Sequence, residues 1–174
     1  KNIINLMGGD IEVASVVNQG STFTFAIWLK DADEENDVVV MDARPENFNG
    51  HRILLVDDVD INRMIVVEML DGTGLTIDEA ENGTEAIEKF QASAKGCYDL
   101  IFMDIQMPGI DGYETASRIR ELDHPDAKTI PIVAMTANAF QEDVDKSLAH
   151  GMNGHLAKPL DFDKIMELLG RFLS

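Results

Sequence analysis

Residues 53–58 (ILLVDD) join a short apolar run to two adjacent acids, and residues 100–104 (LIFMD) repeat this pattern with one acid. Residues 132–136 (IVAMT) and, less strongly, residues 155–158 (HLAK) also run from apolar to polar. Short continuous apolar runs are typical of strands buried on both faces of a parallel sheet. Residues 75–80 (LTIDEA) alternate instead, which favours an exposed edge strand. The chain therefore contains five candidate strands.

Between these runs, apolar side chains recur at the spacing of helices. The recurring residues are Ile61, Ile65 and Met69, then Phe140, Val144 and Leu148, then Phe162, Ile165, Met166, Leu169, Phe172 and Leu173. Gly151 stands where a left-handed helix stop is expected, and Asp161 where an N-cap is expected. Alternating strands and helices over residues 51–174 predict a parallel sheet with helices on both faces.

Polar residues follow four of the expected strands, and ligands bind at the carboxyl ends of strands in such sheets. The residues that should meet there are Asp57, Asp58, Asp104, Thr136 and Lys158. Two unit charges about 4 Å apart repel by about 4 kcal/mol at an effective dielectric constant of about 20, so the carboxylates favour a divalent cation between them. Oxygen ligands with positions left for water favour Mg²⁺. An Asp beside Mg²⁺, a Lys and a Thr is placed to accept a phosphoryl group.

Each of these residues alone has a simpler interpretation. Asp57, Asp58, Asp104 and Thr136 could cap helices, and a Lys before Pro is usually a solvated surface residue. The argument for a site is their joint position after successive strands. His155 alone is more typical of a partly buried structural histidine.

The chain has 174 residues, 32 acids and 14 Lys and Arg residues, with a formal net charge of −18. This balance argues against a nucleic-acid binder that relies on neutralising phosphates. No apolar run approaches the roughly 20 residues that span a bilayer, so we expect no direct membrane contact. A single Cys, Cys97, excludes an internal disulfide. Residues 31–50 hold seven acids and one base, which predicts an extended, solvated linker.

Four stretches resemble the signature motifs of two-component receiver domains. They are LLVDDVDINR (54–63), DLIFMDIQMPGIDGYE (99–114), IVAMTANAF (132–140) and GMNGHLAKPL (151–160). The residues of these motifs are most similar to those of receivers attached to hybrid sensor histidine kinases. The resemblance implies a flavodoxin-like, doubly wound, five-stranded α/β sheet of strand order 2-1-3-4-5, with residues 51–174 as the receiver domain.

The resemblance also implies roles for single residues. Asp104 would be the phosphoacceptor, and Thr136 and Lys158 would contact the phosphoryl oxygens. Mg²⁺ would be bound directly by Asp58 and Asp104, mainly through water by Asp57, and by the backbone carbonyl of Gln106. Thr136 and residue 155 would form the conformational switch. His155 departs from the usual aromatic residue there.

Residues 1–30 resemble the last helix and hairpin of a histidine-kinase ATP-binding domain, on the stretches LMGGDIEVAS and GSTFTF. The motifs of that family that hold Mg²⁺ and nucleotide are absent from this chain. We therefore expect an ATP-binding remnant over residues 1–30, an acidic linker over residues 31–50 and then the receiver domain.

The expected function is transfer of a phosphoryl group from a phosphohistidine domain onto Asp104 and onward to a histidine phosphotransfer domain. The expected location is the cytoplasm, and any membrane anchor of the parent protein is expected in segments other than these. An Asp-nucleophile, Mg²⁺-dependent phosphohydrolase is an alternative, although such enzymes usually carry an Asp-x-Asp pair and a cap domain. A receiver that docks without being phosphorylated is a third.

Overall fold

The computed structural model describes residues 10–16, 20–26, 47–137 and 141–173. The chain divides into two compact units, residues 1–42 and residues 43–174. The first unit holds an antiparallel hairpin of β1 (Asp10–Val16) and β2 (Gly20–Ala26), whose first pair is Asp10 with Ala26. The predicted hairpin is thus present, whereas the helix expected before it lies outside the described residues.

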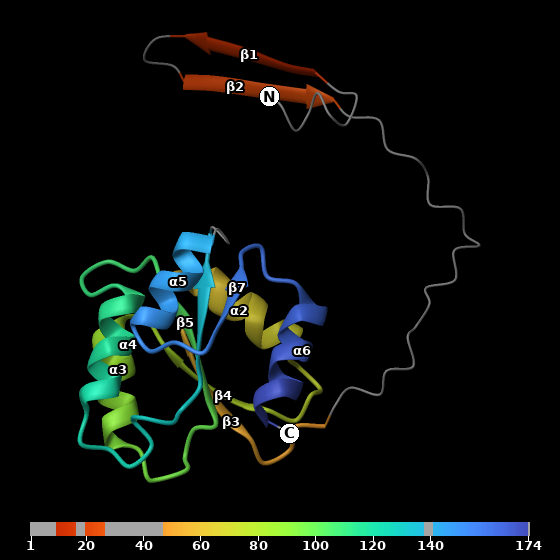
Figure 1. The fold of residues 1–174 in the computed structure, drawn as a ribbon. Coiled ribbons are helices and arrows are strands. Elements are labelled where there is room, and N and C mark those ends of the chain that lie inside the picture. Colours follow the sequence, from red (N-terminus) through yellow and green to blue (C-terminus); the bar gives the residue numbers. More distant parts are fainter. Residues whose placement is uncertain (1–9, 17–19, 27–46, 138–140, 174) are drawn as a thin grey trace. The chain divides into compact units, whose positions relative to one another are not determined.

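The second unit is built on one parallel sheet (Figure 1). Its strands are β3 (Arg52–Val56), β4 (Thr76–Ala80), β5 (Leu100–Asp104), β6 (Ile132–Thr136) and β7 (Gly154–Ala157). Their order is β4-β3-β5-β6-β7, which is the predicted order 2-1-3-4-5. All neighbouring pairs are parallel, so every carboxyl end lies at the same edge. The predicted flavodoxin-like fold is confirmed.

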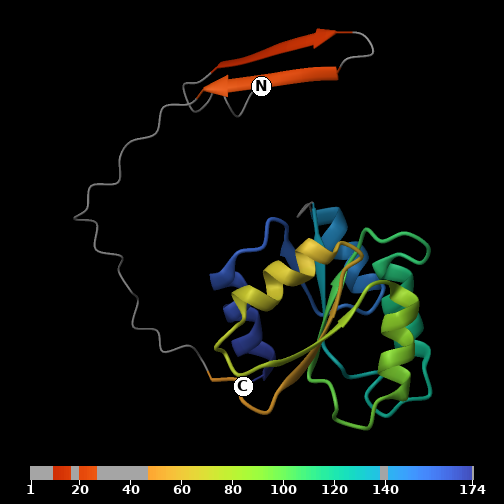
Figure 2. The same cartoon turned by 180° about the vertical axis from the view of Figure 1, so that it is seen from behind.

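Helices cover both faces of this sheet (Figures 1 and 2). They are α2 (Asp60–Met69), α3 (Gly83–Ala92), α4 (Gly112–Glu121), α5 (Gln141–Ala149) and α6 (Phe162–Leu173). Side chains of α3 and α4 pack with Leu54 and Val56 on one face, and side chains of α2 and α6 pack with Ile53 and Leu55 on the other. The alternation along β3 follows from the two-residue period of a strand. Each face therefore has its own apolar core.

Local signals in the sequence set several of the helix ends. Asp111 accepts a hydrogen bond from the backbone N–H of Glu114 at 2.8 Å and so caps α4. The Asp161 carboxylate accepts from the N–H of Lys164 at 3.2 Å, at the predicted start of α6. Gly151 has φ +79°, the left-handed conformation expected of a helix stop.

The apolar stripe predicted for α2 meets the core only at Met69, which is partly buried and packs against it. Ile61 and Ile65 are 56% and 48% exposed, while Val66 and the neighbouring Leu70 are buried. The sequence INRMIVVEML is apolar on several sides of the helix, so helical spacing alone does not decide which side is buried. The buried side also carries Arg63, a charged residue that periodicity does not assign to a core.

Phe48 lies within the range expected for the solvated linker, yet it is buried in the core beneath α2 and α6. Its N–H donates to the carbonyl of Thr73 at 2.9 Å, and its carbonyl accepts from the N–H of His51 at 3.0 Å. The chain thus joins the receiver unit through a packed aromatic residue before β3 begins.

We expect Phe48→Ala to lower the free energy of unfolding of the receiver unit by about 3 kcal/mol, because it empties an apolar site in the core. Phe162, which is 43% exposed at the start of α6, offers a matched control. Phe162→Ala should cost less than about 1 kcal/mol. Urea unfolding followed by circular dichroism measures both, and equal losses would contradict the core position of Phe48.

Candidate functional site

Three carboxylates meet at the carboxyl edge of the sheet. Asp57 and Asp58 follow β3, and Asp104 is the last residue of β5. One carboxylate oxygen of each lies within 4.8 Å of those of the other two. Thr136 ends the neighbouring strand β6, and Lys158 directly follows β7. The structure thus gathers the residues that the strand pattern predicts at this edge.

Lys158 connects two of the carboxylates. Its Nζ lies 2.7 Å from Oδ2 of Asp57 and 2.9 Å from Oδ2 of Asp104. Asp57 and Asp104 are both buried, so water screens these ion pairs little. The Lys158–Pro159 peptide bond is cis.

The surroundings shift the pKa of both Asp104 and Lys158 upward. Burial raises the pKa of the Asp104 carboxyl, and the opposing effect of Lys158 does not cancel this. Burial alone would lower the pKa of Lys158, but its hydrogen bonds to Asp57 and Asp104 outweigh burial and raise it. The lysine is therefore held in its charged form beside a carboxylate whose charged form is disfavoured.

Asp57 is held by residues of the loop and helix that follow it. Its Oδ1 accepts from the Val59 N–H at 2.9 Å and from Asn62 Nδ2 at 3.0 Å. Helix α2 begins with Val59 as N-cap and has no side-chain cap. Asp57 therefore does not cap this helix, and the simpler interpretation of this residue is excluded.

Asp104 is held by the loop that leads to α4. Its Oδ1 accepts from the backbone N–H of Gln106 at 3.2 Å, while the Gln106 residue itself is exposed. Gly112 approaches this loop so closely that a Cβ there would lie 2.2 Å from the Asp104 carbonyl oxygen. Glycine at this position thus lets the start of α4 close against the end of β5.

The two residues expected to form the switch differ in their surroundings. Thr136 is buried at the end of β6, and its carbonyl accepts from the Lys158 N–H at 2.7 Å. His155 is exposed on β7 and lines an open groove with Lys164 and Glu167 of α6. Thr136 thus belongs to the site, while His155 lies on the neighbouring surface and is not a buried structural histidine.

Asn62 and Arg63 contact Asp57, but nothing in the strand pattern marks them. Arg63 donates from Nη1 to the Asp57 carbonyl at 2.8 Å. Both residues stand in the quoted stretch LLVDDVDINR, so only the motif, and not the apolar periodicity, could have drawn attention to them.

The arrangement defines an α/β domain with an acidic site at the edge where its strands end. The described carboxylates are the hard oxygen donors that a divalent cation prefers. The sequence pattern of the response regulator receiver domain matches residues 53–170, and the chain belongs to this family. The predicted receiver domain is therefore confirmed.

Relatives of the chain include histidine kinases. The aerobic respiration control sensor protein ArcB of Escherichia coli is 34% identical over 167 residues, which cover 95% of this chain and 21% of that protein. The chain spans between 6% and 21% of the length of the curated relatives reported with it. It is homologous to the receiver domains of hybrid histidine kinases, and these relatives do not support the phosphohydrolase alternative.

Solved structures agree with the fold. The receiver domain of the sensor histidine kinase PA1611 from Pseudomonas aeruginosa, with magnesium in its active-site cleft, is 34% identical with a TM-score of 0.63. The match covers 71% of this chain and 98% of that domain. The receiver domain of Ssk1 from Saccharomyces cerevisiae, crystallised with the histidine phosphotransfer protein Ypd1, is 30% identical with a TM-score of 0.62. That match covers 70% and 88% of the two chains.

We expect Asp104→Asn to raise the melting temperature of the metal-free protein at neutral pH. The folded protein binds the Asp104 proton more tightly than the unfolded chain, because the folded-state pKa is raised. Stability is therefore lost in the wild type as the pH rises from about 4, the ordinary carboxyl pKa, through the raised value. The variant avoids this loss. Calorimetry in a chelator should show melting temperatures that differ at neutral pH and converge near pH 4.

Proposed function

We propose that Asp104 is the phosphoacceptor of this receiver domain. A carboxylate oxygen of Asp104 bonds to phosphorus while the bond from phosphorus to the imidazole nitrogen of a phosphohistidine breaks, and the nitrogen keeps the electron pair. The observation that carries the proposal is the buried Asp104 carboxylate with Lys158 Nζ at 2.9 Å and two further carboxylates within 4.8 Å.

Lys158 and Thr136 are proposed to bind the transferred phosphoryl group. Lys158 is charged and already contacts the Asp104 carboxylate, so it can pair with the phosphoryl oxygens once the group is on Asp104. Thr136 lies on the adjacent strand and offers a hydroxyl donor. Movement of Thr136 toward the phosphoryl group is the proposed switch, and His155 on β7 is the residue that would respond.

The donor set fits Mg²⁺. Asp58 and Asp104 would hold it directly, Asp57 mainly through water and Gln106 through its carbonyl, and the bound ion would supply positive charge beside the phosphoryl oxygens. Two features support this: the carboxylates converge within 4.8 Å, and the related receiver of PA1611 has magnesium in its active-site cleft.

The phosphohistidine donor is proposed to dock on α2. Ile61, Met64 and Ile65 are exposed on this helix. An apolar groove lined by Asn62, Ile65, Lys158, Pro159 and Leu160 joins the helix to the site. A domain that delivers a phosphoryl group must place its histidine against Asp104, and this apolar surface is continuous with the Lys158 that contacts Asp104. A histidine phosphotransfer domain would take the group at the same edge.

The parent protein is proposed to be a cytoplasmic-facing hybrid histidine kinase. The match to ArcB extends over 95% of this chain and so beyond the receiver residues. The hairpin β1–β2 exposes Val13, Phe23 and Phe25, and a two-stranded hairpin is marginal by itself. Both features support an ATP-binding remnant over residues 1–30. The linker proposed to follow it from residue 31 ends before Phe48, which packs in the receiver core. Within the described residues, none of the helices has the length and apolar character to span a bilayer.

Acetyl phosphate with Mg²⁺ should add one phosphoryl group to this chain, because the small donor replaces the phosphohistidine. Intact-mass spectrometry should show one added group in the wild type and none in Asp104→Asn. A chain that releases phosphate from phosphomonoesters with many turnovers would instead favour the phosphohydrolase. An unchanged mass in the folded wild type would favour a receiver that only docks.

Millimolar Mg²⁺ should raise the melting temperature, since a ligand that binds only the folded state stabilises it by RT ln(1 + [Mg²⁺]/Kd). Asp58→Ala removes a proposed ligand and should abolish the shift. Asp161→Ala, which changes an acid at the start of α6, serves as the matched control and should keep it. The same Mg²⁺ shift in both variants would contradict the assignment of Asp58.

A further inference from the structure

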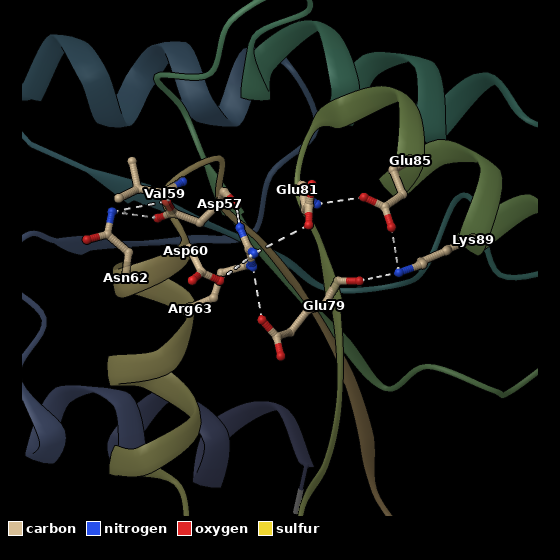
Figure 3. Close-up of polar contacts among 9 residues, drawn as sticks. All are labelled: Asp57, Val59, Asp60, Asn62, Arg63, Glu79, Glu81, Glu85 and Lys89. Atoms are coloured by element: carbon tan, nitrogen blue, oxygen red, sulfur yellow. Dashed lines mark hydrogen bonds and ion pairs between the residues drawn. The ribbon is translucent and has the colours of Figure 1, made fainter.

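Arg63 is a buried cation beside the acidic site. Its side chain is only 7% exposed. Burying a charge is costly unless it is paired and hydrogen-bonded, so the partners of this guanidinium show what holds it there. They belong to three parts of the chain: the loop after β3, the first turn of α2 and the end of β4 (Figure 3).

The contact to the site is a hydrogen bond to the backbone. Nη1 of Arg63 donates to the carbonyl oxygen of Asp57 at 2.8 Å. This carbonyl belongs to the peptide between Asp57 and Asp58, two of the three carboxylates of the site. The orientation of this peptide sets the directions in which both side chains leave the backbone, because they flank it.

The other nitrogens of Arg63 are held by acids. Nε lies 2.9 Å from Glu79 and Nη2 lies 2.9 Å from Asp60, with Glu81 at 3.7 Å. Arginine suits this role because its planar fork presents five N–H donors in fixed directions.

A second layer of contacts holds the acids themselves (Figure 3). The Glu81 N–H donates to Glu85 of α3 at 2.8 Å, and Lys89 pairs with Glu85 at 2.7 Å. Lys89 also donates to the carbonyl of Glu79. The segment that receives Arg63 is therefore tied to α3, on the opposite face of the sheet from α2.

We propose that Arg63 is a positioning residue of the metal site: it fixes the Asp57–Asp58 peptide against β4 and α3, so that both carboxylates are preset for the cation. The inference rests on the proposed Mg²⁺ site but assigns a residue that does not touch the ion. Partners of metal ligands commonly change metal affinity by about 10-fold to 100-fold when they are removed.

The direction in which Mg²⁺ affinity changes when Arg63 is replaced separates a positioning role from a purely electrostatic one. Removing a positive charge close to a cation site should by itself strengthen cation binding. Loss of the contact that orients two ligands should weaken it. If positioning dominates, Arg63→Met therefore weakens Mg²⁺ binding although it makes the surroundings more negative.

Calorimetric titration of the full chain with MgCl₂ tests this. We expect the dissociation constant to rise at least about 10-fold in Arg63→Met and by less in Arg63→Lys, whose single ammonium cannot reach every partner. Lys89→Met removes the same charge from the same acidic network without touching Asp57 and should leave binding unchanged or tighter. Unchanged or tighter binding in Arg63→Met would overturn the proposal, and Arg63→Lys decides in the same way if Arg63→Met does not fold.

A second control and a metal-free measurement complete the test. Arg120 donates to the carbonyls of Ala127, Ile130 and Gly151, so Arg120→Lys disturbs an arginine network outside the site and should leave Mg²⁺ affinity unchanged. Without metal, the Val59 amide, which donates to Asp57, should exchange its hydrogen faster in both Arg63 variants than in the wild type. Wild-type exchange rates there would overturn the positioning role, whereas absence of Mg²⁺ binding by the wild type would overturn only the proposed metal site.

Discussion

The burial of two carboxylates at one edge of a parallel sheet is the constraint on which the rest of this structure depends. Asp57 directly follows β3 and Asp104 ends the neighbouring strand β5. Val56 pairs with Met103 in the sheet, so the closeness of the two acids follows directly from the register. Two buried negative charges need a cation nearby. Lys158 supplies it from the end of β7, the outermost strand on the side of β5 and β6. That compensation is incomplete, because one ammonium faces three carboxylates. The remaining negative charge is what the proposed divalent cation would offset.

The features that the sequence predicts are those set by neighbouring residues along the chain, and the features that it misses depend on residues far apart in the sequence. Apolar runs mark the strands, and the residues that directly follow them mark the site, because a strand carries its last residue to the edge automatically. Asp57, Asp104, Thr136 and Lys158 were predictable for this reason. Arg63 was not, because its burial depends on acids of β4 that pattern and spacing do not place beside α2. The burial of Phe48 was missed likewise, since its pocket is formed by helices distant in sequence.

Helix α2 has two faces with different tasks. Its buried side carries Val66 for the core and Arg63 for the Asp57 peptide, while Ile61 and Ile65 are exposed. The apolar pattern of α2 does not show which side is buried, because the helix carries apolar side chains both on its core side and on its solvent side. Asn62 and Arg63 of α2 hydrogen-bond directly to Asp57. A shift of α2 would therefore also shift the loop that carries Asp57 and Asp58.

The place where the preceding chain joins the receiver unit also matters. Phe48 is anchored beside Thr73, ahead of the amino end of β3, whereas Asp57 and Asp58 follow its carboxyl end. Phe48 therefore attaches at the end of β3 opposite to the edge that carries the three carboxylates. That attachment point does not compete with the proposed phosphohistidine donor and the proposed phosphotransfer acceptor for the same edge. The Phe48 anchor thereby separates the attachment of the domain from the chemistry proposed at that edge.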